Sequence, residues 1–162
     1  MPPRVSIRSA TADDAEAVLT CLRLAFEPFR ASYTSDAYRD TVPTLDAIHA
    51  RLASMCVLVA VSPDGEIVGT IAAQRAGPNE GHLRGMAVRP GWQGAGVADR
   101  LLEAAERTVV DWNCSCLSLD TTEPLQRAIR FYLRHGFRAS GRVTDFFGMP
   151  LFEYLKILVR RA

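Results

Sequence analysis

The sequence predicts a single mixed α/β domain over residues 1–162, and two observations support this prediction. Segments with a strand pattern alternate with segments of helical periodicity, in the order strand, two helices, three strands, helix, strand, helix and a final pair of strands. The later half contains a strand–helix–strand unit, whose two strands should pair in parallel for steric and chiral reasons. We therefore expect a central mixed, twisted sheet of about six to seven strands flanked by about four helices.

The first half supplies the early elements of this order. Residues 5–8 (VSIR) have a strand pattern, and the T-A-D-D at residues 11–14 can cap a helix that ends near Phe26. Residues 27–42 are aromatic and irregular, which favours a long loop lining a pocket. A second helix is expected over residues 44–53, because its apolar residues recur at helical spacing.

A hairpin and the strand–helix–strand unit follow. Residues 56–61 (CVLVAV) and 66–74 (EIVGTIAAQ) are two apolar strands joined by an S-P-D-G turn. Residues 82–88 (HLRGMAV) and 116–120 (CLSLD) predict the two strands around a helix at 96–110. That helix has one apolar face that should meet the sheet, formed by Val97, Leu101, Ala105 and Val109.

The composition is that of an ordinary globular protein, with 48% hydrophobic and 23% charged residues and a formal net charge of +1. Such a balance provides no basic field for nucleic acid and no polybasic run for a membrane surface, so we expect a small-molecule or protein partner. The N-terminal residues lack the apolar core of a secretory signal. The four cysteines are Cys21, Cys56, Cys114 and Cys116, and they lack the spacing of a metal site. We expect them to be buried free thiols, which favours a cytoplasmic location and a protein without a bound metal.

The glycines before the predicted helix at 96–110 suggest a ligand. The first N–H groups of a helix have no partner inside it, and missing side chains at Gly94 and Gly96 would let phosphate oxygens reach them. A Walker-type loop is excluded, since the lysine and hydroxyl are missing. A dinucleotide fingerprint is a weak alternative, because Asp99 stands at its third glycine position. A simple turn with a helix cap is the third interpretation.

Two motifs resemble the GCN5-related N-acetyltransferase (GNAT) family. Residues 93–98 (QGAGVA) match the Arg/Gln-x-x-Gly-x-Gly/Ala loop of that family, and Val88 and Pro90 precede it at the expected spacing. Residues 128–137 (AIRFYLRHGF) are similar to its A-I-x-x-Y-x-x-x-G-F element. One departure is Leu125, where many members have an asparagine that contacts the cofactor.

The resemblance implies that acetyl-CoA binds in the gap between the strands at 82–88 and 116–120. Its pantetheine would pair with the backbone of Met86, Ala87 and Val88, and the N–H of Val88 or a neighbour would stabilise the oxyanion. Its pyrophosphate would rest on the backbone amides of Gln93, Gly94, Ala95, Gly96, Val97 and Ala98.

The same resemblance suggests catalytic residues. Tyr132 would donate a proton to the leaving thiolate, since a phenol stays protonated at neutral pH; a core role is the alternative. Asp120 would act as the base, unless it caps the following turn, with Glu80 and His82 as alternates. Six aromatic residues would border the acceptor pocket: Phe26, Phe29, Tyr33, Tyr38, Phe146 and Phe147.

The expected function is therefore transfer of the acetyl group of acetyl-CoA to a primary amine, on a small molecule or a protein, by direct attack in a ternary complex. A non-catalytic acyl-CoA sensor and a dinucleotide-dependent oxidoreductase are the alternatives. A homodimer is left open.

Overall fold

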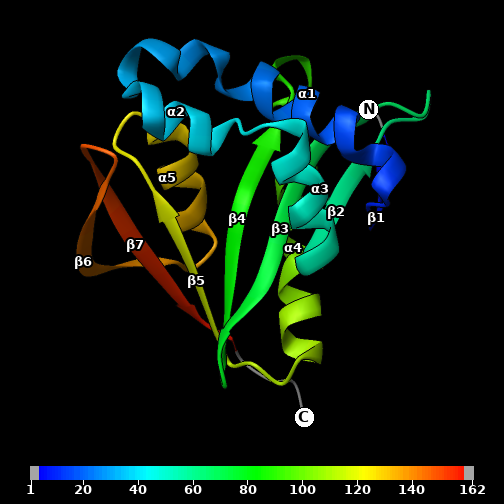
Figure 1. Ribbon diagram of the computed structural model, residues 1–162. Helices are drawn as coiled ribbons and strands as arrows, with labels where there is room; N and C mark the ends of the chain where they lie inside the picture. The colour runs from blue at the N-terminus through cyan, green and yellow to red at the C-terminus, as the bar shows by residue number, and fades with distance from the viewer. Residues whose placement is uncertain (1–3, 159–162) are drawn as a thin grey trace.

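The computed structural model describes residues 4–158 and is organised around a seven-stranded sheet with the order β1-β2-β3-β4-β5-β7-β6 (Figure 1). Its strands are β1 (Ser6–Ser9), β2 (Cys56–Val61), β3 (Ile67–Gly77), β4 (Glu80–Val88), β5 (Cys116–Thr121), β6 (Arg138–Phe146) and β7 (Met149–Ile157). Strands β4 and β5 are parallel, and all other neighbours are antiparallel. The predicted mixed sheet and its parallel pair are confirmed.

Helices cover both faces of the sheet. The α-helices are α1 (Ala15–Phe26), α2 (Ser35–Thr41), α3 (Leu45–Ser54), α4 (Val97–Asp111) and α5 (Gln126–Arg134). Helices α1 and α3 lie against one face, and α4 packs against β2, β3 and β4 on the other (Figure 1). Each face therefore has its own apolar cluster, with the central strands between them.

The apolar face of α4 confirms the predicted stripe. Val97, Leu101, Ala105 and Val109 are at most 1% exposed. Gly81 on β4 faces this helix, and a Cβ atom added there would lie only 2.5 Å from Val109 Cγ1. The missing side chain therefore lets α4 approach β4 closely.

The start of α1 also agrees with the sequence. Asp14 accepts a hydrogen bond from the Thr11 backbone N–H at 2.7 Å, in a capping box on the 3-10 helix Ala12–Asp14 that leads directly into α1. The Arg8 guanidinium donates to both oxygens of Asp14, at 2.7 and 3.0 Å. These hydrogen bonds lower the pKa of Asp14 to about 2.

Residues 27–42 differ from the expected irregular loop. A 3-10 helix, Glu27–Ser32, is followed by α2, which begins after Thr34. The Thr34 hydroxyl caps α2 by accepting from the Ala37 N–H at 3.2 Å, and the Ala37 side chain is fully buried. The prediction was wrong because so short a helix depends on its cap and one buried contact rather than on periodicity.

Strands β4 and β5 separate part-way along their length. Their paired register ends at Leu83 and Leu119, whereas β4 continues to Val88. On its other edge β5 pairs with β7 along its whole length, and β4 contains a bulge at Gly85, whose φ is +62°. Figure 1 shows the two strands diverging. This split leaves backbone groups of β4 without a partner strand on the side of β5.

Candidate functional site

A cavity of about 840 Å³ lies at the split. Its walls come from the end of β4, the start of α4, α5 and the end of α1. All of the predicted cofactor residues except Ala95 line it: Met86, Ala87, Val88, Gln93, Gly94, Gly96, Val97 and Ala98. The structure therefore brings the predicted pantetheine and pyrophosphate positions into one continuous space.

The glycines of this loop have left-handed backbone. The φ angles are +81° at Gly94 and +82° at Gly96, which is the N-cap of α4. A Cβ atom added at Gly96 would meet no atom within 4 Å, so the space above this amide is open. The Gln93 amide donates to the Val88 carbonyl at 3.0 Å and ties the loop to β4. The glycines thus allow the turn into α4 and leave the backbone N–H groups at its N-terminus uncovered by side chains.

Three arginines of α5 also line the large cavity, and the sequence analysis did not identify them: Arg127, Arg130 and Arg134. Arg127 donates to the Gln93 side-chain oxygen at 3.3 Å, which places its guanidinium beside the glycine loop. Leu125, at the departure from the family pattern, lines the same cavity. The spacing of three and four residues along α5 was a usable signal for one charged helix face.

Tyr132 of α5 is buried in the core and also reaches the large cavity. The residue is 7% exposed, and its ring packs edge-on against Phe131 and Phe137. It also lines the large cavity, and its hydroxyl forms no hydrogen bond within residues 4–158. Burial raises the pKa of the phenol above its usual value, so the group remains protonated at neutral pH.

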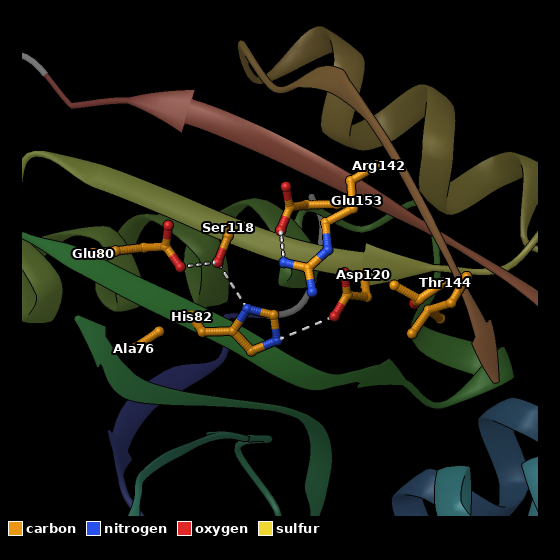
Figure 2. A pocket seen from close by; sticks show the side chains of 9 residues that line it. Ala76, Glu80, His82, Ser118, Asp120, Arg142, Thr144 and Glu153 are labelled. Atoms are coloured by element: carbon orange, nitrogen blue, oxygen red, sulfur yellow. Dashed lines mark hydrogen bonds and ion pairs between the residues drawn. The ribbon is translucent and has the colours of Figure 1, made fainter.

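A second cavity, of about 270 Å³, lies on the other face of the sheet. Leu117 and Leu119 of β5 join the apolar cluster under α4, so Ser118 and Asp120 point to the opposite face. Polar side chains from four strands line this cavity, as Figure 2 shows: Glu80, His82, Ser118, Asp120, Arg142, Thr144 and Glu153.

These side chains form a connected polar network. The Ser118 hydroxyl donates to Glu80 at 3.0 Å and lies 2.8 Å from His82 Nδ1 (Figure 2). Because the carboxylate of Glu80 only accepts, the hydrogen of Ser118 is used there and Nδ1 of His82 is the donor. His82 Nε2 then faces Asp120, whose Oδ2 lies 3.6 Å away.

Asp120 is a stronger base than an ordinary aspartate. Burial raises the pKa of its carboxyl group, and the nearby His82 opposes that rise. Arg142 and Glu153 form a neighbouring ion pair at 3.8 Å and were missed by the sequence analysis. The alternates Glu80 and His82 lie in the same cavity as Asp120, whereas Tyr132 lies in the other one.

The predicted aromatic border is distributed differently. Phe26 and Phe29 line the large cavity, and the Tyr33 hydroxyl is hydrogen-bonded to Thr122 at 2.5 Å. None of the six aromatic side chains lines the small cavity. The polar lining of that space comes from β4, β5, β6 and β7.

A sheet split between two parallel strands, with a glycine loop at the following helix, defines the GNAT fold class. The chain belongs to the acetyltransferase (GNAT) family, whose model matches residues 18–137. It is 33% identical over 81 residues to an uncharacterized N-acetyltransferase of Mycobacterium tuberculosis, in a match covering 50% of this chain and 52% of that protein. The chain thus spans about half the length of the curated relatives it matches.

Solved structures share the fold over nearly the whole chain. A GNAT acetyltransferase of Staphylococcus aureus superposes with a TM-score of 0.79 at 22% identity, covering 96% of this chain and 100% of that one. PaiA N-acetyltransferase of Thermoplasma acidophilum, solved with coenzyme A, gives 0.77 at 18% identity, covering 95% and 99%. The yncA protein of Salmonella typhimurium, solved with acetyl-CoA, gives 0.74 at 18% identity, covering 98% and 96%.

All four cysteines are free; Cys21 and Cys114 are buried as predicted, whereas Cys56 and Cys116 are half-buried. Within residues 4–158 no helix is long and apolar enough to cross a membrane. The same residues include no group of three or more histidine, cysteine, aspartate or glutamate side chains arranged to hold a metal ion.

Proposed function

We propose that the protein is an N-acetyltransferase that transfers the acetyl group of acetyl-CoA to a primary amine by direct attack in a ternary complex. The observation that supports this most strongly is the split between β4 and β5. The large cavity extends past the split from α5 to the end of α1, and the small polar cavity lies where β4 and β5 are still paired. Two substrates can therefore approach one another from different sides of the sheet.

The residues of the large cavity fit acetyl-CoA. The open amide at Gly96, the left-handed backbone at Gly94 and the guanidinium of Arg127 beside it suit a pyrophosphate. The unpaired edge of β4 from Arg84 to Val88 suits the amide groups of a pantetheine arm. Solved structures of the same fold contain coenzyme A or acetyl-CoA. When bound, acetyl-CoA supplies the activated acetyl group.

The roles of the protein side chains follow from their surroundings. The Asp120 carboxylate, whose pKa is raised by burial, accepts the proton that the attacking amine must lose. The Val88 backbone N–H is proposed as the oxyanion donor. Tyr132 keeps its proton at neutral pH and donates it to the departing sulfur. The free cysteines favour a reducing, cytoplasmic location for the reaction.

Isothermal titration with acetyl-CoA, and with NAD as a control, tests the proposal. We expect acetyl-CoA to bind and NAD not to bind. Gly96→Glu should abolish binding, because it places a negative charge at the anion site, whereas Gly96→Ala controls for backbone strain alone, since its Cβ meets no neighbour. Binding of NAD in place of acetyl-CoA would favour the oxidoreductase, and binding of neither would refute the loop assignment. Acetyl-CoA binding without transfer to any amine would favour the sensor.

A further inference from the structure

A guanidinium lies directly on the bulge of β4. Arg51 of α3 reaches across the sheet to Gly85, where a Cβ atom would be 2.8 Å from Arg51 Nη1. Gly85 has a φ of +62° and lies just beyond the last paired residue of β4 and β5. The missing side chain at Gly85 therefore leaves room for a cation at the split itself.

The protein neutralises this cation only in part, through the nearby carboxylate of Asp40. Arg51 is half-buried and forms no hydrogen bond or ion pair with any residue from 4 to 158. Burial and the neighbouring charge of Arg84 lower the pKa of Arg51 to about 10, so the group is still charged at neutral pH. Arg84 itself has only an ion pair with Asp40, at 3.7 Å.

Two guanidiniums therefore share one carboxylate, and the cluster has an excess of one positive charge. A half-buried positive charge that is only partly balanced costs free energy, and an anion placed between Arg51 and Arg84 would reduce that cost. The excess of a single charge matches a carboxylate better than a doubly charged phosphate. Planar guanidiniums also bind carboxylates through paired hydrogen bonds.

The cluster is next to the proposed proton acceptor. His82 and Arg84 are opposite Gln74 and Ala72 of β3 in an uninterrupted register, so their side chains share one face of β4. Two residues of a strand span about 7 Å. His82 faces Asp120 and Arg84 faces Asp40, which places an amine-binding group and an anion-binding group side by side.

We propose that Arg51 and Arg84 form an anion subsite of the acceptor cleft, and that the acceptor is a free amino acid, a small amine that also bears a carboxylate. This inference rests on the proposed acetyltransferase function. In a protein, a lysine or an N-terminal residue has its carboxyl group bound in a neutral amide. Such an acceptor would therefore not neutralise the excess positive charge of Arg51 and Arg84. Asp40 is the internal carboxylate with which such an acceptor would compete.

The experiment compares L-amino acids with their α-amides as acceptors, by the rate of coenzyme A release. We expect amino acids to be preferred by about 10- to 100-fold in kcat/KM, mainly through KM, as for charge-assisted hydrogen bonds. The amides are less basic and contain more neutral amine, so their intrinsic reactivity opposes this preference. Acetylation of both series at equal rates overturns the subsite and leaves the acetyltransferase proposal intact.

Variants separate a binding role from a structural one. Arg51→Gln and Arg84→Gln should each reduce the ratio of acid to amide rates by about 10-fold or more. Asp40→Asn should act in the opposite direction and lower KM for the amino acids, because a competing carboxylate is removed. Arg39→Gln, which removes an exposed ion pair with Asp36 on the same helix as Asp40, is the matched control. An unchanged ratio in Arg84→Gln, or a higher KM in Asp40→Asn, overturns the inference.

Failure of the proposed function would look different. Loss of acetyl-CoA binding in the titration would refute the cofactor site, whatever the acceptor. Bound acetyl-CoA with transfer only to peptides, or to amines without a carboxylate, would overturn the amino-acid acceptor alone.

Discussion

Replacing Tyr132 with phenylalanine separates catalysis from packing. The ring packs against Phe131 and Phe137, and phenylalanine preserves those contacts. The hydroxyl has no hydrogen-bond partner within residues 4–158, so its removal leaves no unsatisfied group behind. We therefore expect Tyr132→Phe to change the free energy of unfolding by less than about 1 kcal/mol.

The rate should respond quite differently. If the phenol donates a proton to the departing sulfur, its loss should lower kcat by about 100- to 10,000-fold. The affinity for acetyl-CoA should be almost unchanged, because the hydroxyl is one polar atom in a cavity of about 840 Å³. A large loss of kcat without a loss of stability or binding would indicate a chemical role.

The assay combines urea denaturation, titration with acetyl-CoA and steady-state release of coenzyme A. Tyr154→Phe is the matched control, because Tyr154 is half-buried on β7 and lines neither cavity. A Tyr132→Phe enzyme with the kcat of the wild type would refute the proton-donor assignment. It would also show that Tyr132 serves the core alone.

Three further predictions concern pH and packing. Asp120→Asn should remove the acidic limb of the kcat/KM profile, which in the wild type should lie above the usual range of an aspartate because burial raises the pKa; an unchanged limb would exclude Asp120 as the base. Gly81→Ala should lower the free energy of unfolding by about 1–3 kcal/mol through its clash with α4, whereas Gly77→Ala, with no neighbour within 4 Å, should not. Asp14→Asn should cost about 1 kcal/mol at pH 7, because its ion pair with Arg8 is partly exposed. The Asp14 pKa is lowered to about 2, so this difference, measured by urea denaturation, should fade as the pH drops from 4 toward 2 and would contradict the ion-pair argument if it persisted.

Local signals predicted most elements correctly. The stripe from Val97 to Val109 predicted the buried face of α4, since helical periodicity depends only on residues a few positions apart. The capping residues near Thr11 likewise predicted the helical start of this segment, which is the 3-10 helix Ala12–Asp14 leading into α1. Helix α2 was missed because its seven residues are stabilised by a cap and by contacts with distant segments, such as the hydrogen bond that the Thr34 hydroxyl donates to the Phe147 carbonyl.

The sequence by itself determined the order of the elements apart from the segment 27–42, the parallel crossover and the glycine loop, because each is encoded in neighbouring residues. Only the tertiary structure decided that β4 and β5 separate after Leu83 and Leu119, next to the bulge at Gly85. It also decided that Arg51 lies over that bulge, 34 positions away along the chain. Sites assembled from several strands and helices depend on register and crossing geometry, and those follow from packing across the whole domain rather than from local pattern.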